Sequence, residues 1–155
     1  MSTPPNFELT LLLTLGSRVT IDDLHRRLAA LGYDDVRPAH GFIFQRIARG
    51  GATGSELAAF LDVTKQAASA MVAQLERGGY VASGPHPTDR RGKIITLTAR
   101  GWDCLHASAT ILGEIETRWA AIIGAERLAA LRSDLRHLIA ETNGGTLPRR
   151  FRPVW

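Results

Sequence analysis

Residues 64–100 bring together side chains whose groups hydrogen-bond to nucleic acids. Gln66 and Gln74 each offer a donor and an acceptor, which match the adenine edge in the major groove of DNA. Lys65 can reach a guanine edge or a phosphate, and the Arg91 guanidinium suits a narrow, electronegative minor groove. This chemistry predicts contact with double-stranded DNA.

The net positive charge of the chain lies in the same segment. The net charge of the chain is +4. Residues 64–100 hold six basic and two acidic residues, which gives +4, while the thirteen basic and thirteen acidic residues elsewhere cancel. A polyanion would stabilise such a concentration of charge. The alternative is a solvated basic face, which does not explain why the charge coincides with the side chains named above.

Two short helices joined by a tight turn are expected to position these side chains. Thr53 stands three residues before Glu56, the spacing of a capping box, and Thr64 suits the N-cap of a second helix that Gly78-Gly79 ends. Apolar residues at helical spacing predict the buried face, namely Leu57, Ala58, Leu61, Ala68, Met71, Val72 and Leu75. The outward positions of the second helix are then Lys65, Gln66, Ser69, Ala70, Ala73 and Gln74.

A hairpin with a basic tip follows the second helix. Residues 80–82 and 93–97 are rich in β-branched and aromatic residues and predict two strands. The tip between them, residues 84–92, contains Arg90 and Arg91. Helix, turn, helix and basic hairpin, in that order, are typical of a winged helix-turn-helix.

Longer helices flank this unit on its N-terminal side. Residues 7–31 approximate one helix, although Gly16 weakens its middle, so a kink or two abutting helices is an alternative. Its expected apolar stripe consists of Leu12, Leu15, Val19, Leu24, Leu28 and Leu31. Pro38 suits the first turn of the next helix, which stops at Gly50-Gly51.

Two more helices are expected on the C-terminal side. Thr98 suits the N-cap of a long amphipathic helix, Gly124 ends it, and a final helix runs to about residue 143. The sequence thus predicts a mainly α fold with a small β wing, in one domain spanning residues 1–155.

Composition indicates the cellular compartment expected for the protein. Cys104 is the single cysteine, so the chain cannot form an internal disulfide, and this fits a reducing compartment. No apolar run approaches a membrane-spanning length, and residues 7–15 lack the basic leader of a signal peptide, so a cytoplasmic protein is expected. Residues 1–6 and 146–155 are expected to be irregular.

The hairpin carries the most specific motif of the chain. Asp89 and Arg91, an apolar strand, and then Leu97-Thr98-Ala99-Arg100-Gly101 resemble the wing of the MarR (multiple antibiotic resistance regulator) family, written D-x-R followed by L-T-x-x-G. Residues 55–58, 63–66 and 75–81 support the resemblance, which extends over about residues 7–142.

The resemblance implies a homodimeric transcriptional regulator, most often a repressor, that binds a palindromic operator and responds to a small aromatic effector. It places DNA binding in about residues 38–98 and dimerisation in about residues 7–31 and 99–142. The DNA-binding residues expected are Ser55, Thr64, Lys65, Gln66, Ser69, Ala70, Gln74, Arg90, Arg91 and Lys93. The dimer-interface residues expected are Leu12, Trp119, Ile122, Leu128, Leu131, Leu135 and Leu138.

Two residues qualify what the resemblance implies. Relatives often carry arginine where this chain has Ala70, so a relative's operator sequence does not transfer. In the family, the acid at Asp89 holds the wing arginine in position, and a charge-assisted pair with Arg91 is the expected interaction. The alternative for Asp89 is a functionally idle surface ion pair.

Other residues with reactive or ionisable side chains are expected to have structural roles. Cys104 is expected to be a packed thiol, and Asp22-Asp23 and Asp34-Asp35 to be solvated caps. The scattered histidines predict no metal site and no cofactor. The effector site is left unassigned, although Phe42, Phe44 and Trp102 could line a crevice. An enzyme is disfavoured, and the remaining alternative is a winged helix that binds protein rather than DNA.

Overall fold

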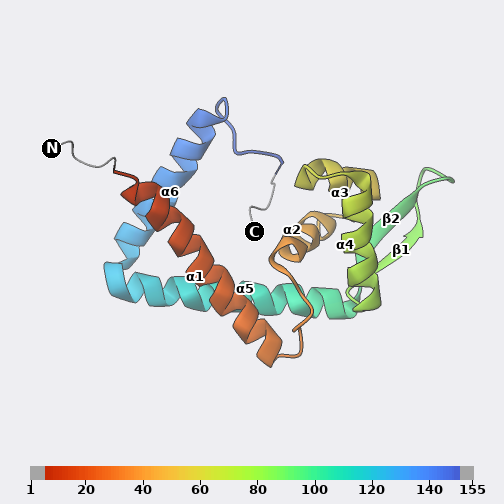
Figure 1. Cartoon of the computed structure of the whole chain (residues 1–155), viewed down its shortest axis with the longest axis horizontal. Helices are drawn as coiled ribbons and strands as arrows, with labels where there is room; N and C mark the ends of the chain where they lie inside the picture. The colour runs from red at the N-terminus through yellow and green to blue at the C-terminus, as the bar shows by residue number, and fades with distance from the viewer. Residues whose placement is uncertain (1–5, 151–155) are drawn as a thin grey trace.

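The computed structural model describes residues 6–150. Its order is α1 (Glu8–Ala30), α2 (Pro38–Ile47), α3 (Gly54–Leu61), α4 (Lys65–Arg77), β1 (Val81–Pro85), β2 (Lys93–Leu97), α5 (Ala99–Ile123) and α6 (Ala125–Thr142). The expected mainly α fold with a small β wing is confirmed (Figure 1). Of the two ends expected to be irregular, residues 1–5 and 151–155 lie outside the described part of the chain.

Local capping interactions explain where α3 and α4 begin. The Thr53 hydroxyl accepts the Glu56 N–H at 3.2 Å, and the Glu56 carboxylate accepts the Thr53 N–H at 2.8 Å, which completes the expected capping box. The Thr64 hydroxyl accepts the Ala67 N–H at 3.1 Å and caps α4. Between the helices Asp62 adopts a left-handed conformation with φ of 52°, which reverses the chain tightly.

The wing is a two-stranded antiparallel sheet whose register runs from Val81 opposite Leu97 to Pro85 opposite Lys93. The expected bounds of its first strand are wrong, because β1 begins after Tyr80 and continues to Pro85. Tyr80 is instead buried, with its ring 5.8 Å from that of Phe44. A β-bridge between Ala52 and Ile95 ties the wing to the chain just before α3.

Helix α1 is one continuous helix, as expected, so the alternative of two abutting helices is wrong. Leu24 and Leu28 alone of its expected apolar stripe are buried in the chain's own core, whereas Leu12, Leu15, Val19 and Leu31 are exposed. The N-terminal part of α1 therefore shows an apolar surface that no other segment of residues 6–150 covers.

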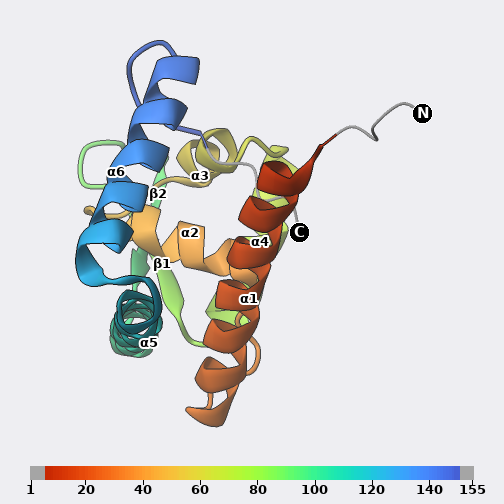
Figure 2. The same ribbon diagram turned by 90° about the vertical axis from the view of Figure 1, so that its left-hand side faces the viewer.

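The long helices separate two ends of the molecule. Helix α1 packs across α5, and α6 turns back from the end of α5, so that α1 and α6 diverge from the α5 axis (Figures 1 and 2). The helices α2 to α4 and the wing lie together around the other end of α5. The carboxylate of Asp23 in α1 pairs with Arg118 of α5 at 2.6 Å, so the expectation of a solvated cap at this residue is wrong.

Candidate nucleic-acid interface

A groove of about 470 Å³ lies where the start of α3, the first turns of α4 and the wing meet. It contains five residues predicted to bind DNA or orient the wing, namely Ser55, Lys65, Ser69, Asp89 and Lys93. Thr53, Gly54 and Gly92 also line it, and these three are not among the predicted DNA-binding or wing-orienting residues. The N-termini of two helices, each with free backbone N–H groups, border this groove, and such ends suit phosphate oxygens.

The exposed residues of α4 are Lys65, Gln66, Ser69, Ala70, Gln74, Glu76 and Arg77, and the first five of these are the exposed members of the predicted outward face. Ala68, Val72 and Leu75 are buried as predicted, whereas Met71 and Ala73 are half-buried. Gln66 and Gln74 are both exposed, and both remain candidates for reading a base edge.

The tip of the wing is organised by backbone hydrogen bonds. The Asp89 carboxylate accepts the Arg91 N–H at 2.9 Å, and His86 Nδ1 accepts the N–H groups of Thr88 at 3.3 Å and Asp89 at 3.1 Å. The Gly92 N–H donates to the Asp89 carbonyl at 3.1 Å. Within residues 6–150 no ion pair joins Asp89 to Arg91, so the expected charge-assisted pair is wrong in the free protein. Asp89 instead fixes the backbone from which Arg91 projects.

Arg100 is exposed, but its guanidinium is held by contacts with the protein itself. Its guanidinium donates to the carbonyls of Gly78 at 3.1 Å and Gly32 at 3.0 Å, and to the Tyr80 hydroxyl at 3.1 Å. It also lies over the rings of Tyr33 and Tyr80, at 5.2 and 4.7 Å from their centroids. The sequence could not reveal this arrangement, because it joins segments that are far apart in the chain.

Tyr80 and Asp35 complete the cluster around Arg100. The Tyr80 hydroxyl donates to the Asp35 carboxylate, so the expectation that Asp35 is a solvated cap is wrong. Burial, and then this hydrogen bond, raise the pKa of Tyr80 to about 12. The exposed basic residues of 64–100 are Lys65, Arg77, Arg90, Arg91, Lys93 and Arg100, and of these Arg100 is already bound to protein groups.

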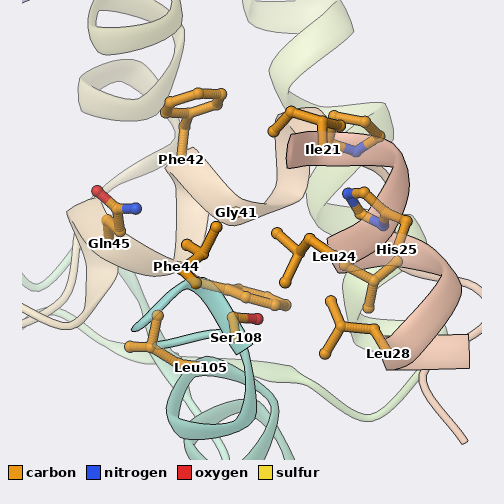
Figure 3. A pocket seen from close by; sticks show the side chains of 13 residues that line it. Ile21, Leu24, His25, Leu28, Gly41, Phe42, Phe44, Gln45, Leu105 and Ser108 are labelled. Atoms are coloured by element: carbon orange, nitrogen blue, oxygen red, sulfur yellow. The ribbon is translucent and has the colours of Figure 1, made fainter. Parts of the chain in front are cut away.

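A second hollow, of about 210 Å³, lies between α1, α2 and α5 (Figure 3). Phe42 and Phe44 line it, as expected of a crevice, but Trp102 does not. Trp102 is 39% exposed, with its ring 5.8 Å from that of His106. Cys104 is fully buried, as predicted for a packed thiol, and burial raises its pKa to about 11.

Of the residues predicted to form a dimer interface, Leu12, Ile122, Leu131 and Leu138 are exposed, whereas Trp119, Leu128 and Leu135 are half-buried and Trp119 packs against the core. Leu12, Trp119, Leu131 and Leu135 line an apolar groove of about 460 Å³ where α1 faces α6. Ile122 is 78% exposed and Leu138 is also exposed. Leu128 lies in a different hollow, at the corner between α5 and α6. In α6 itself no residue is buried.

Within residues 6–150, no helix is long and apolar enough to span a membrane. The same residues contain no group of three or more His, Cys, Asp or Glu side chains placed to hold a metal ion.

Comparison with known proteins connects this geometry to a family. Residues 34–92 match the family model described as the MarR family. The transcriptional activatory protein BadR of Rhodopseudomonas palustris is 36% identical over 62 residues, which make up 38% of this chain and 35% of BadR. The chain thus matches only about a third of the length of that relative.

The overall fold is that of solved transcriptional regulators. The regulator Tm0710 from Thermotoga maritima superposes with a TM-score of 0.64 at 22% identity, over 91% of this chain and 99% of that one. A mutant MarR from E. coli, complexed with operator DNA, superposes with a TM-score of 0.68 at 23% identity, over 86% of this chain and 94% of that one. At these identities the likeness shows a shared fold.

Proposed function

The winged-helix region of this chain belongs to the MarR family, and on that premise we propose that the protein is a homodimeric repressor that binds a palindromic operator and is released by a small aromatic effector. Family and fold are those of transcription regulators rather than of enzymes. One observation carries the proposal: the groove at the start of α3 gathers residues from α3, α4 and the wing beside exposed positive charge. Three elements that are separate in sequence thus form one surface for a polyanion.

The proposed contacts divide between the two grooves of DNA. Helix α4 enters the major groove, where Gln66 reads a base edge and Ala70 leaves room for a thymine methyl. Ser55, Thr64, Lys65, Ser69 and Lys93 bind phosphates at the margins of that groove. Arg91, held by the backbone geometry that Asp89 sets, enters the adjacent minor groove with Arg90 at its edge.

The dimer is proposed from the uncovered apolar surface of α1 and α6. A second copy would cover Leu12, Leu131 and Leu138, which are 56, 44 and 59% exposed. A two-fold axis through residues 7–31 and 99–142 would present two copies of the 38–98 region to one face of DNA. Their α4 helices would then meet successive major grooves, about 34 Å apart.

The effector is proposed to act at the hollow between α1, α2 and α5. Helix α1 belongs to the proposed dimer region and α2 to the proposed DNA-binding region, so a ligand there would contact both. A ligand that binds one spacing of the two α4 helices better than the other shifts the population of that spacing. Repression rather than activation is proposed from the family resemblance, although BadR is named as an activatory protein.

The proposal is tested by selecting bound duplexes from a random pool and measuring affinity by fluorescence anisotropy across a salt series. Arg91→Ala should weaken binding to every A·T-flanked site and reduce the salt slope by about one unit per half-site. Gln66→Ala should cost about 1–3 kcal/mol on the selected operator and little on scrambled DNA. Arg127→Ala, an exposed arginine of α6, is the matched control and should change neither.

Two outcomes would overturn the proposed function. If no duplex is enriched, the alternative of a protein-binding winged helix gains support. If Arg91→Ala binds DNA as the unaltered protein does, the wing is not a DNA contact.

A further inference from the structure

His86 lies at the start of the loop that joins β1 to β2 and is tied to the end of that loop by its backbone. Its N–H donates to the Gly92 carbonyl at 3.1 Å, and a Cβ built on Gly92 would lie only 3.2 Å from the His86 Cβ. His86 is half-buried, and Gly92 lines the groove at the start of α3. The His86 side chain therefore begins beside the surface proposed to meet DNA.

One nitrogen of the His86 ring is used inside the loop. Nδ1 accepts the backbone N–H groups of Thr88 at 3.3 Å and Asp89 at 3.1 Å, and it lies 3.3 Å from the Thr88 hydroxyl. A nitrogen that accepts from N–H groups carries no hydrogen, so these bonds assign the hydrogen of the ring to Nε2. The folded loop thus selects one tautomer of His86.

The other nitrogen is left with a donor to offer. The two nitrogens of an imidazole point in nearly opposite directions, so Nε2–H points away from the backbone that Nδ1 holds. Among residues 6–150 no group accepts a hydrogen bond from Nε2. His86 therefore has a spare N–H donor.

The neighbouring acid outside the wing is already engaged. The Glu56 carboxylate accepts the Thr53 N–H at 2.8 Å and pairs with Arg46 at 3.3 Å. The Thr53 hydrogen bond is the main cause that lowers the pKa of Glu56, and a charge on His86 adds a smaller part, so the ring lies near the start of α3. The spare donor is thus close to a helix N-terminus that suits phosphate oxygens.

The charges around His86 favour an anion as its partner. Arg90, Arg91 and Lys93 are exposed, and the Asp89 carboxylate is occupied by the Arg91 N–H at 2.9 Å. A phosphate oxygen accepts hydrogen bonds and has no hydrogen to donate, so it matches a ring nitrogen that carries one.

We propose that His86 is a phosphate-binding residue of the wing, in which Nδ1 holds the tip and Nε2–H donates to an oxygen of the DNA backbone. His86 is an addition to the DNA-binding residues predicted from the sequence, and the inference rests on the proposed function for its partner. Unlike Arg91 and Lys93, the neutral ring contributes a hydrogen bond without releasing a counterion. Its contact positions the wing on any duplex, because phosphates carry no base identity.

Two substitutions separate the roles of the two nitrogens. In His86→Asn the amide oxygen is as many bonds from the backbone as Nδ1, so the variant keeps the acceptor for Thr88 and Asp89 and loses the donor. In His86→Gln the amide nitrogen takes the position of Nε2, so the variant keeps the donor and loses the acceptor. His137→Asn, at an exposed histidine of α6, is the matched control.

Fluorescence anisotropy at pH 8.0 across a salt series measures the DNA contact. His86→Asn should bind about tenfold more weakly than the unaltered protein, because it loses a hydrogen bond to a charged group. The loss should be equal on the selected operator and on scrambled DNA, and the salt slope should not change. Arg91→Ala, by contrast, should reduce that slope.

Hydrogen exchange of the Asp89 amide, followed by NMR on the full chain without DNA, measures the loop contact. This amide should exchange in His86→Asn as it does in the unaltered protein, and faster in His86→Gln. A variant that keeps this protection and loses DNA affinity assigns the loss to Nε2–H.

Several results contradict the inference: DNA binding by His86→Asn equal to that of the unaltered protein, a loss confined to the selected operator, or a salt slope reduced as in Arg91→Ala. Faster Asp89 exchange in His86→Asn, with the same affinity as His86→Gln, also contradicts it, because His86 would then only support the loop. A failure of the proposed function looks different. The unaltered protein would bind no duplex, whereas exchange of the Asp89 amide would still respond to His86→Gln.

Discussion

At the tip of the wing, the Asp89 carboxylate accepts the Arg91 backbone N–H at 2.9 Å. Its negative charge is close to the surface proposed to meet phosphates, where it opposes binding. The geometry accounts for an acid in this position, because an oxygen two residues before an N–H closes a tight local turn. We therefore expect that the wing needs an acceptor oxygen at residue 89 rather than a charge.

Substitution of this residue separates the two roles. Asp89→Asn retains the acceptor oxygen and removes the charge, so DNA affinity should equal or exceed that of the unaltered protein. Asp89→Ala removes the acceptor, and affinity should fall several-fold as the loop loses a hydrogen bond worth about 1 kcal/mol. Fluorescence anisotropy on the selected operator measures both. If the asparagine variant is as weak as the alanine variant, the charge itself is required.

His40 links stability to pH. It is buried, its Nδ1 accepts the Arg37 N–H at 3.0 Å, and burial followed by the charge of Arg37 lowers its pKa. The unfolded chain therefore binds more protons than the folded one once the pH falls below about 6.5. Stability should be complete above that pH and decline as the pH falls toward the folded-state pKa. The pKa of His25 is lowered too and acts in the same direction.

Thermal unfolding at pH 7.5 and 5.0 measures this effect. His40→Gln keeps an acceptor at the third position of α2 without a group that titrates in this range, so the loss of melting temperature on acidification should shrink. His137→Gln, at an exposed histidine of α6, should leave that loss unchanged. An unchanged loss in His40→Gln would contradict the assignment.

At the scale of elements, the first turn of α5 packs against the backbone of the segment just before β1. The Thr98 hydroxyl accepts the Gly101 N–H at 3.1 Å and donates to the Gly79 carbonyl at 2.6 Å, which fixes the start of the helix. A Cβ at Gly101 would lie 2.1 Å from the Tyr80 carbonyl oxygen. The glycine of the L-T-x-x-G motif is thus explained by close packing of helix against backbone.

Two glycines of α5 offer a matched pair of substitutions. Gly101→Ala should destabilise the protein by at least about 3 kcal/mol, because a backbone atom must move to admit the methyl group. Gly113→Ala meets nothing within 4 Å and should stabilise the helix by about 0.5–1 kcal/mol. Urea denaturation gives both free energies of unfolding. A mild effect at Gly101 would mean that α5 can shift away from the wing.

The elements that the sequence predicts well are those set by local signals. Thr53, Thr64 and Thr98 each cap the helix expected of them, because a cap bonds to an N–H only two or three residues away. Contacts between distant segments could not be predicted in this way. The Arg100 cluster joins residues separated by as many as 68 positions, and the Asp23–Arg118 pair spans 95.

The candidate site was predictable to a similar degree. Helical periodicity identified the exposed face of α4, and motif spacing identified the wing. The role of His86 in the wing tip was not predicted, because only the folded loop places its Nδ1 before two backbone N–H groups. The apolar period of α1 was read correctly, but periodicity does not say whether a stripe faces the chain's own core or another surface.

At the scale of the whole molecule, the proposed dimer depends on that uncovered surface. Helix α1 exposes five leucines and α6 exposes Leu131, Leu138 and Ile139, and the groove between the two helices lacks a filling element among residues 6–150. An interface of about 2,000 Å² is expected of an obligate dimer. In the proposed dimer, both the spacing of the two α4 helices and the stability of α6 would depend on the second copy.

A charge placed in this surface should separate the dimer. Leu131→Glu would bury a carboxylate in an apolar contact, so light scattering should show a shift from a dimer toward the 16.9 kDa monomer at micromolar concentration. Ser133→Glu, two residues along α6, is the control and should remain dimeric. If the unaltered chain is itself a folded monomer at that concentration, the proposed dimer is wrong.

The Arg100 guanidinium binds carbonyls at two helix ends at once, just beyond α1 at Gly32 and at the end of α4 at Gly78. Helix ends ordinarily fray independently of one another. Here the same side chain donates to both ends, so when Arg100 moves away with one fraying end, the carbonyl at the other end also loses its donor. Amide hydrogens in the last turns of α1 and α4 should therefore exchange with solvent through a common opening. Arg100→Lys, which lacks the forked donor, should let the two ends exchange at separate rates.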